Sequence, residues 1–393
     1  MTLANAVICL SHLRWRFVRQ RPQHLLSRCA RDRTVFFWEE PIFDADVPRR
    51  ALDRTDDGVI VVTPHLVPDT SPAEVEATLR SLLDGMMVEQ GITQPVLWYY
   101  TPMALPFTRH VRPRAIVYDC MDELSLFQGA PPTLTELEAQ LLGRADVVFT
   151  GGHALFEHKR DRHANIHPFP SSVEVPHFAR ARQIDEEPVD QASIPRPRVG
   201  FFGVIDERMD LALIQAVAEL RPDLHIVMIG PVVKIDPRSL PQRPNLHWLG
   251  GKDYDALPAY LAGWDAAILP FARNESTRFI SPTKTPEYLA AGRPVVSTSI
   301  RDVVRPYQEL GLARIADEPG AFATALDEAL AEDDDQRIAR ADRFLANLSW
   351  DQTWSEMWRK VEASARRRAE RSQPVAGGSA TAPASSPRRK QAV

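Results

Sequence analysis

The chain has 393 residues, of which 44% are hydrophobic and 25% are charged. This length and composition are typical of a globular protein with two domains, each large enough to bury its own core. A formal net charge of -5 does not favour nucleic-acid binding, which usually requires an excess of positive charge.

Cysteine usage and hydropathy bear on the compartment. Cys9, Cys29 and Cys120 show no metal-ligand spacing, so we expect reduced and partly buried thiols. The N-terminus lacks a signal-peptide pattern, and no apolar stretch is long enough to cross a bilayer. The sequence therefore predicts a cytoplasmic protein.

The first half of the chain alternates apolar strands with amphipathic helices. Strands are expected at 6–10, 34–38, 59–62, 96–100, 115–118 and 145–150, with helices starting at 21 and spanning 71–89 and 134–144. Such alternation predicts a parallel sheet covered by helices. Ligands of these sheets bind beyond the carboxyl ends of the strands, so the loops that follow the strands are the first places to look for function.

The loop after the first strand is basic and aromatic. It contains His12, Arg14 and Trp15, and Arg21 stands at the start of the next helix. The arginines are candidates for contacts with an anionic molecule or a membrane surface. A solvated helix face is the simpler explanation for most of them, and His12 could equally cap the loop.

Acidic residues follow the strand at 115–118. Asp119 and Asp122 stand at its carboxyl end. Because a carboxylate can take a proton from a hydroxyl group, Asp122 is the preferred catalytic candidate. The alternative is that these carboxylates cap a turn. His153 opens the helix that follows the strand at 145–150.

The second half repeats the strand–helix pattern after a polar, proline-rich linker at 181–197. Gly203, Gly230 and Gly250 each end an expected strand, and Asp206 and Arg208 follow the first of these glycines. A glycine at this point lets the backbone approach a phosphate closely. These residues are therefore candidates for a phosphate-binding edge of a second parallel sheet.

The C-terminal part carries fewer functional signals. Asp333, Asp334 and Asp335 follow an expected helix at 317–331 and are expected to form a solvated turn. Tryptophans recur at helical spacing within 349–371 and are expected to pack against the body of the protein. Residues 372–393 are rich in Ala, Ser and Pro, so we expect a disordered tail.

The segment 279–298 has the densest pattern. Thr285 can cap a helix and Pro286 suits its first position, with Glu287 in the first turn, Gly292 at the end and a buried strand beyond it. The positive end of a helix can bind a diphosphate, whose charge Lys284 could neutralise. Glu287 could accept two hydrogen bonds from a ribose diol. The alternative is a capped surface helix leading into a core strand.

The motif P-T-K-x-x-E-Y-L-A-A-G-R-P-V-V at 282–296 resembles the donor-binding segment of GT-B glycosyltransferases of the family-4 type (glycosyl transferases group 1). The resemblance extends to about residue 370. It implies that Glu287 holds the nucleotide ribose and that the loop holds the diphosphate through Ser281, Thr283, Lys284 and Thr285. Many relatives carry a second Glu where this chain has Phe279.

The opening S-H-L-R-W-R-F-V-R-Q-R-P-Q-H-L-L at 11–26 resembles GT-B transferases linked to bacterial envelope polysaccharides. The implied fold class is α/β, with two Rossmann-like domains whose parallel sheets face a central cleft. The implied domains are an acceptor domain at 1–180, completed by a helix at 349–371, and a donor domain at 198–348. The linker at 181–197 joins them, and the tail at 372–393 follows.

The implied function is transfer of a sugar from a nucleotide-diphosphate sugar to a glycan or lipid-linked acceptor. No cofactor or metal is expected, UDP-sugars are the first donors to consider, and peripheral membrane contact would suit a lipid-linked acceptor. The implied catalytic residues are Asp122 and His12. The implied donor residues include Gly203, Asp206, Arg208, Gly230 and Gly250, and the acceptor-side residues are Arg14, Trp15, Arg21 and His153.

Three questions stay open at this point. Family-4 resemblance implies retention at the anomeric carbon, but the unusual first loop also allows inversion with Asp122 as base. A sugar-nucleotide epimerase could use the same fold and donor site. A non-catalytic scaffold of an envelope-assembly complex would keep the fold without turnover, and Phe279 favours that alternative.

Overall fold

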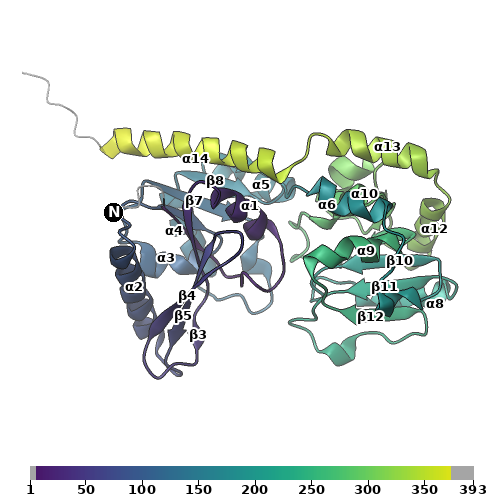
Figure 1. The fold of residues 1–393 in the computed structure, drawn as a ribbon, viewed down its shortest axis with the longest axis horizontal. Coiled ribbons are helices and arrows are strands. Elements are labelled where there is room, and N and C mark those ends of the chain that lie inside the picture. Colours follow the sequence, from purple (N-terminus) through teal and green to yellow (C-terminus); the bar gives the residue numbers. More distant parts are fainter. Residues whose placement is uncertain (1–5, 373–393) are drawn as a thin grey trace, which may run out of the picture.

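The computed structural model describes residues 6–372. Two α/β units lie side by side, and a long C-terminal helix runs from the second unit across the top of the first (Figure 1). Each unit is built on a mainly parallel sheet. The predicted α/β class with two mainly parallel sheets is confirmed.

The first sheet contains nine strands in the order β3-β5-β2-β1-β6-β7-β8-β9, with β4 paired to β5. Its strands are β1 (Ala6–Leu10), β2 (Thr34–Trp38), β3 (Ile42–Phe43), β4 (Arg49–Arg54), β5 (Ile60–Leu66), β6 (Val96–Tyr99), β7 (Ala115–Cys120), β8 (Val147–Thr150) and β9 (Ile166–Pro168). Neighbouring strands are parallel except for the β4–β5 pair. The central strands are buried on both faces, which explains why they read as continuous apolar runs.

Helices cover both faces of the first sheet. They are α1 (Arg21–Cys29), α2 (Pro72–Glu89), α3 (Leu105–Thr108), α4 (Leu134–Arg144), α5 (His153–Lys159) and α14 (Trp350–Ser372). One apolar cluster joins the sheet to α2, α3, α4 and α5. The opposite cluster joins it to α1 and α14, and the tryptophans at 350, 354 and 358 lie in that cluster. The expected tryptophan stripe therefore packs against the first sheet.

The second sheet has six parallel strands in the order β12-β11-β10-β13-β14-β15. They are β10 (Arg198–Phe202), β11 (His225–Ile229), β12 (Leu246–Gly250), β13 (Ala266–Leu269), β14 (Val295–Ser297) and β15 (Arg314–Ile315). Its helices are α8 (Leu211–Leu220), α9 (Leu257–Ala262), α10 (Lys284–Ala290), α11 (Arg301–Val303), α12 (Pro319–Leu330) and α13 (Asp334–Leu345). A single apolar core unites these elements.

Two chain segments connect the sheets. The first passes through α6 (Val175–Ala179) and α7 (Val189–Ala192), so the stretch at 181–197 contains a helical turn in addition to polar loop. Gln191 in this turn is fully buried and donates a hydrogen bond to the Tyr260 carbonyl at 3.0 Å. The second connection leads from α13 into α14.

Some local predictions were wrong. Helix α10 begins at Lys284 after Thr283, which makes no side-chain cap, so Thr285 is not the cap and Pro286 is the third helical residue. Proline is tolerated there because the first turn leaves its N–H groups without intrahelical partners. The acidic run expected to be a turn instead starts α13, where Asp333 caps the N–H of Gln336 at 2.9 Å.

The short strands β3 and β4, which both pair with β5, were also missed, because β3 has only two residues and β4 is mostly charged. The three cysteines are buried and free, as expected. None of the helices between residues 6 and 372 combines the length and apolar character needed to cross a membrane. The tail expected to be disordered lies beyond the described residues.

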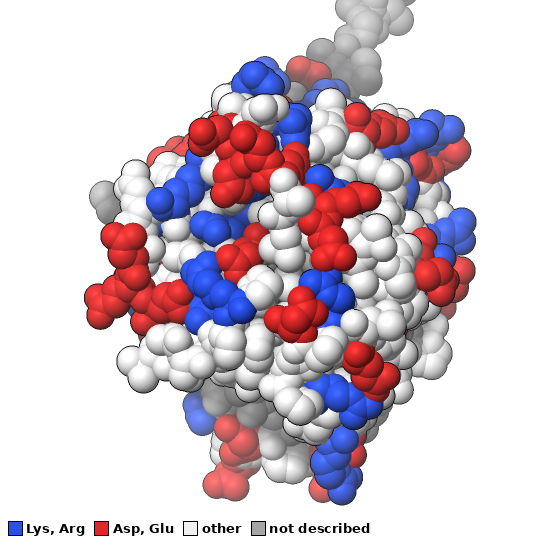
Figure 2. Space-filling model, turned by 90° about the vertical axis from the view of Figure 1, so that its right-hand side faces the viewer, with Lys and Arg blue, Asp and Glu red and all other residues white. Residues whose placement is uncertain are grey.

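Surface charge is mixed on the face that the second unit presents. Figure 2 shows basic and acidic side chains interspersed over this face. Many are close ion pairs, such as Arg221 with Asp223 and Arg314 with Glu332. Surface pairs of this kind contribute little to stability, so the informative charges are those inside the cleft.

Candidate active site

A cavity of about 590 Å³ lies between the two sheets. Its walls come from both units, mainly from loops that follow the carboxyl ends of strands, where ligands of parallel sheets bind. The first unit contributes the loop at 15–21, the turn at 54–57, Met121, Asp122 and Gly151, and the second contributes Gly203, Val204, Arg208, Gly230, Pro231, Lys252, Tyr254, Leu257, Ile280, Ser281, Pro282, Thr283, Lys284 and Glu287. The cleft therefore joins most of the residues that the sequence singled out.

Two glycines shape the wall of the second unit. Gly203 ends β10 with φ +143°, and a Cβ there would lie 2.1 Å from Cε of Lys284. Gly230 ends β11 with φ +153°, and a Cβ there would lie 1.7 Å from the carbonyl oxygen of Gly203. Side chains are excluded by both the backbone conformation and the space. The glycines thus allow Lys284 to lie directly over the ends of two strands.

Lys284 is the most unusual charge in the cleft. Its side chain is partly buried, with Nζ 6.0 Å from the ring centre of Phe201. Among residues 6–372 its ammonium has neither an ion pair nor a hydrogen bond. Burial lowers the pKa of Lys284, against the opposing effect of Glu287. A partly buried cation without a charged partner is costly, and an anionic ligand would remove that cost.

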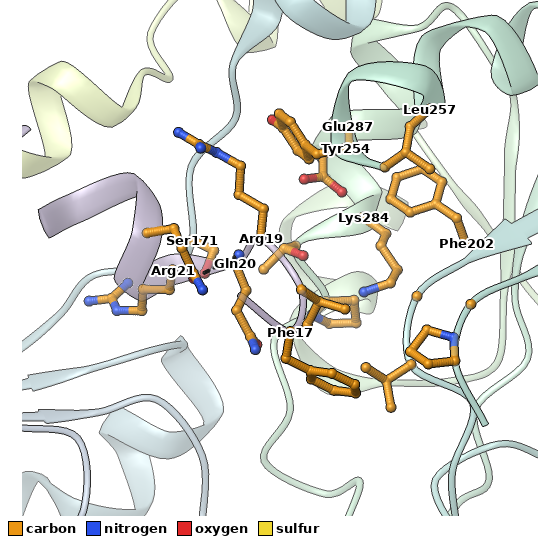
Figure 3. A pocket seen from close by; sticks show the side chains of 18 of the residues that line it. Phe17, Arg19, Gln20, Arg21, Ser171, Phe202, Tyr254, Leu257, Lys284 and Glu287 are labelled. Carbon is orange, nitrogen blue, oxygen red and sulfur yellow. Dashed lines mark hydrogen bonds between the residues drawn. The ribbon is translucent and has the colours of Figure 1, made fainter. Parts of the chain in front are cut away.

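Glu287 lies one turn further along α10. It is 8% exposed, and burial raises its pKa, with Lys284 opposing the shift. Figure 3 shows the Glu287 and Lys284 side chains directed into the same space, with Tyr254 beside Glu287 and the segment carrying Arg19 and Gln20 on the opposite side. The Glu287 carboxyl group thus faces the same space as the Lys284 ammonium, so one ligand can contact both.

Arg208 is held by Asp206. Nε and Nη2 of Arg208 donate to the Asp206 carboxylate at 3.0 and 2.7 Å. Asp206 is buried and does not line the cavity, whereas Arg208 does. Phe127 of the first unit lies across the cleft, with its ring centre 5.5 Å from the Arg208 guanidinium. Asp206 therefore orients Arg208 toward the cleft instead of contacting a ligand in it.

Asp122 faces this group of charges from the first unit. Burial raises the pKa of Asp122 to about 6, while Arg208 lowers it and Asp206 raises it. Lys284 is also among the groups that act on its charge. A carboxylate with this pKa changes protonation near neutral pH, which suits a proton acceptor.

His12 lies at the same end of the first sheet but does not line the cavity. Burial and the nearby Lys234 lower the pKa of His12 to about 4, against a hydrogen bond with the Tyr100 backbone. The imidazole is therefore neutral at pH 7. It can accept or donate a hydrogen bond there, but it carries no charge.

The arginines of the first loop are engaged within the protein. Arg21 is buried against Asp119 at 2.9 Å and donates to the Phe169 carbonyl at 2.6 Å. Arg14 donates to Glu39 at 3.0 Å, and the same carboxylate accepts from the Trp15 backbone at 2.8 Å. Trp15 lines the cleft. Arg14 and Arg21 thus shape the loop that presents Trp15.

The remaining candidates are spread out. Ser281 and Thr283 line the cleft, whereas Thr285 is buried inside the second unit. The Gly250 carbonyl accepts a hydrogen bond from the N–H of Gly230 at 2.9 Å, so it supports the cleft wall from behind. His153 lines a separate cavity of about 510 Å³ at the connection between the units.

The sequence reasoning missed three residues near the charges. Lys234 reaches the first unit, with Nζ 5.0 Å from the Phe127 ring centre. Tyr254 donates to Glu174 at 3.2 Å, and its ring lies 5.4 Å below the Arg19 guanidinium. Lys234 and Phe127 stand in loops without a distinctive pattern. Only their positions, five and seven residues after the ends of β11 and β7, could have pointed to them.

Comparisons with known proteins agree with this geometry. Residues 196–332 match the family described as Glycosyl transferases group 1. The chain is 23% identical over 282 residues to TuaH of Bacillus subtilis (strain 168), a proposed teichuronic acid biosynthesis glycosyltransferase, covering 67% of this chain and 70% of that one.

Solved structures share the fold across nearly the whole chain. A trehalose-6-phosphate structure from E. coli bound with UDP-2-fluoro glucose has a TM-score of 0.67 at 13% identity, covering 91% of this chain and 99% of that one. Anabaena Alr3699/HepE in complex with UDP and glucose has a TM-score of 0.61 at 15% identity, covering 93% and 98%. The chain is a glycosyltransferase of the GT-B fold, related through its second domain to the group 1, family-4-like enzymes.

Proposed function

We propose that the protein transfers a sugar from a nucleotide-diphosphate sugar to a glycan or lipid-linked acceptor, without a metal ion and with retention at the anomeric carbon. The observation that carries the proposal is Lys284, an unpaired and partly buried cation in the cleft, with Glu287 one turn away. The diphosphate of the donor would supply the missing negative charge. The ribose diol would donate two hydrogen bonds to Glu287.

Leaving-group stabilisation in this proposal depends on side chains of the second domain. Negative charge grows on the diphosphate as the bond to the sugar breaks, and fixed cations stabilise it most effectively in a site shielded from water. Lys284 and Arg208 are the cations that line the cleft near Gly203. Arg208 is pre-oriented by Asp206, so little reorganisation is needed during the reaction.

The acceptor would bind on the wall of the first domain. Asp122 stands at the end of β7 and faces the cations of the second domain. It would orient the acceptor hydroxyl and take its proton. Family-4 resemblance supports retention, and an NMR determination of the anomer in the product tests it: an inverted product would mean that the acceptor attacks from the face opposite the departing diphosphate.

The relatives indicate which donor nucleotide and which pathway to test first. Structural neighbours contain UDP or a UDP-sugar, which makes UDP the first nucleotide to test. TuaH is named for teichuronic acid biosynthesis, which supports a role in making an envelope polysaccharide. An acceptor that is part of such a polymer or its lipid-linked precursor fits this role.

A thermal-shift comparison of UDP, GDP and ADP tests the donor site. A nucleotide at 100 times its dissociation constant stabilises a protein by about 2.7 kcal/mol. We expect one nucleotide to raise the melting temperature of the wild type and to lose most of this effect in Glu287→Ala and Lys284→Met. Glu328→Ala, on the exposed side of α12, is the matched control and should keep the full shift.

The outcome also separates the alternatives. If no nucleotide stabilises the wild type, the proposed donor site is wrong. If one nucleotide does stabilise the wild type, incubation with its nucleotide sugar in the absence of acceptor tests the epimerase alternative, since only an epimerase would interconvert the sugar under those conditions. Unchanged activity in the presence of EDTA is expected for a metal-independent transferase.

A further inference from the structure

Helix α5 of the first domain is in contact with two segments of the second domain. One is the loop at 270–283, which leads into α10, and the other is α11. Both segments belong to the part of the second domain that carries Lys284. These contacts lie beside the cleft, and the function proposed above does not assign them a role.

Asp302 of α11 makes the buried polar part of these contacts. Its two carboxylate oxygens accept hydrogen bonds from the backbone N–H groups of His153 at 2.8 Å and Ala154 at 3.0 Å. The carboxyl is buried, with the residue only 4% exposed. An ion pair also joins Arg301 of α11 to Glu157 of α5.

Gly152 makes this approach possible. A Cβ at Gly152 would lie 2.2 Å from Oδ2 of Asp302 and 2.6 Å from Cβ of Ser281. Any side chain would push the two domains apart at this point. Because Ser281 also lines the cleft, this contact reaches directly into the candidate donor loop.

Phe279 makes the apolar part of the contact. It is 8% exposed and belongs to the apolar cluster of the first domain, although its backbone is part of the second. Its ring is stacked on His158 of α5, with centroids 4.5 Å apart and planes at 30°. It is absent from the cavity lining, whereas the residues from Ile280 to Lys284 line it.

We propose that Phe279 and Asp302 are positioning residues that dock the donor loop onto α5, so that Ser281 and Lys284 are held in the cleft only while the domains are docked. The inference rests on the proposed donor site for its functional consequence. Phe279 is five residues from Lys284 and Ser281 lies between them, so the docked loop leaves Lys284 little freedom. Position 279 then serves the domain contact and does not touch the sugar.

Substitutions at these two positions test the docking. Asp302→Asn and Phe279→Ala should each raise the dissociation constant of the nucleotide about tenfold, within the range typical of coupling between sites. Phe279→Leu, which keeps an apolar group, should recover most of the affinity. The amides of His153 and Ala154 should exchange faster in Asp302→Asn, and small-angle scattering should show a larger radius of gyration.

Matched controls separate docking from general destabilisation. Asp210 caps α8 within the second domain by accepting from Leu213 N–H at 2.8 Å, and Phe322 is buried in the core of the same domain. Asp210→Asn and Phe322→Ala should lower the melting temperature while leaving nucleotide affinity and α5 exchange unchanged.

Two results would overturn the proposal. One is Phe279→Glu with donor turnover equal to or above the wild type, since the side chain at 279 would then reach the sugar. The other is unchanged exchange at α5 in both docking variants. If the wild type binds no nucleotide, the proposed function fails, but exchange and scattering still decide whether these residues dock the domains.

Discussion

The two walls of the cleft differ in how their cations are satisfied. On the first domain, Arg19 and Arg21 each have an acidic partner, at 3.5 Å from Asp57 and 2.9 Å from Asp119. On the second domain, Lys284 has no ion pair or hydrogen bond among residues 6–372, and burial lowers its pKa. The cations Arg19 and Arg21 of the first wall are thus neutralised within the protein, whereas Lys284 of the second wall is not. This difference favours a charged diphosphate on the second domain and a hydroxyl-bearing acceptor on the first.

The largest effect on activity is expected at Asp122, where the two walls meet. Asp122→Asn should lower kcat by about 100-fold or more, since general acid–base groups contribute on the order of 10² to 10⁴ in rate. Because burial raises the pKa of Asp122 to about 6, wild-type kcat/KM should fall as the pH drops below 6. A pH–rate profile that keeps this limb in Asp122→Asn would exclude Asp122 as its source.

The same group predicts a pH dependence of stability. A carboxyl whose pKa is raised on folding binds its proton more tightly in the folded state, so its contribution to stability is lost as the pH rises toward 6. The melting temperature of Asp122→Asn relative to the wild type should therefore increase between about pH 4 and 6. Taking this difference removes the opposite contribution of His12, whose pKa is lowered to about 4.

The next largest loss of activity is expected at Lys284, the cation of the second wall that has no acidic partner. Lys284→Met should lower kcat/KM for the donor about 100-fold, comparable with the loss of one electrostatic stabiliser of a transition state. The unliganded variant should melt at a higher temperature than the wild type, because a poorly solvated cation has been removed. A variant with normal donor kinetics would show that the unpaired charge serves something other than the diphosphate.

A smaller effect, of about tenfold in donor affinity, is expected for Gly203→Ala. The new methyl group would collide with Lys284 and require a strained backbone, which costs of order 1–3 kcal/mol. Gly311→Ala is the matched control, since Gly311 also has a positive φ of 66° but its Cβ would meet nothing closer than 3.8 Å. If both variants lose the same donor affinity, backbone strain alone explains the loss in Gly203→Ala, and the collision with Lys284 does not contribute.

Sequence patterns were informative wherever local chemistry decides structure. The motif at 282–296 predicted a short helix with Glu287 in its first turn, which α10 confirms, although the helix begins at Lys284, which was expected in the preceding loop. The position of Gly203 and Gly230 at strand ends followed from the same pattern of buried strands and loops. These features depend on a few neighbouring residues, so they can be read without the rest of the fold.

Features that depend on long-range contact could not be derived in this way. The Arg21–Asp119 pair spans 98 positions, and Arg21 looked like one of several solvated arginines in the sequence. In the sequence, Phe279 was notable only because many relatives carry Glu there. The neighbouring residues give no sign that its ring packs into the other domain. Lys234 reaches Phe127 only through the approach of the two sheets.

The smallest effect on donor binding is expected from Arg21, and it is the most direct test of the contrast between the walls. Arg21→Leu leaves Asp119 as an unpaired buried carboxylate, and breaking such a pair costs about 3–5 kcal/mol. The variant should unfold at a much lower denaturant concentration, whereas the nucleotide affinity of the fraction that stays folded should change less than about threefold, because Arg21 already has its charge partner within the protein. Calorimetric titration at low temperature measures that affinity.

Arg21→Leu combined with Asp119→Leu should regain stability, since the unpaired charge is gone. If donor affinity instead falls as far as in Lys284→Met while stability is kept, Arg21 binds the substrate, and the first wall is not complete without a ligand.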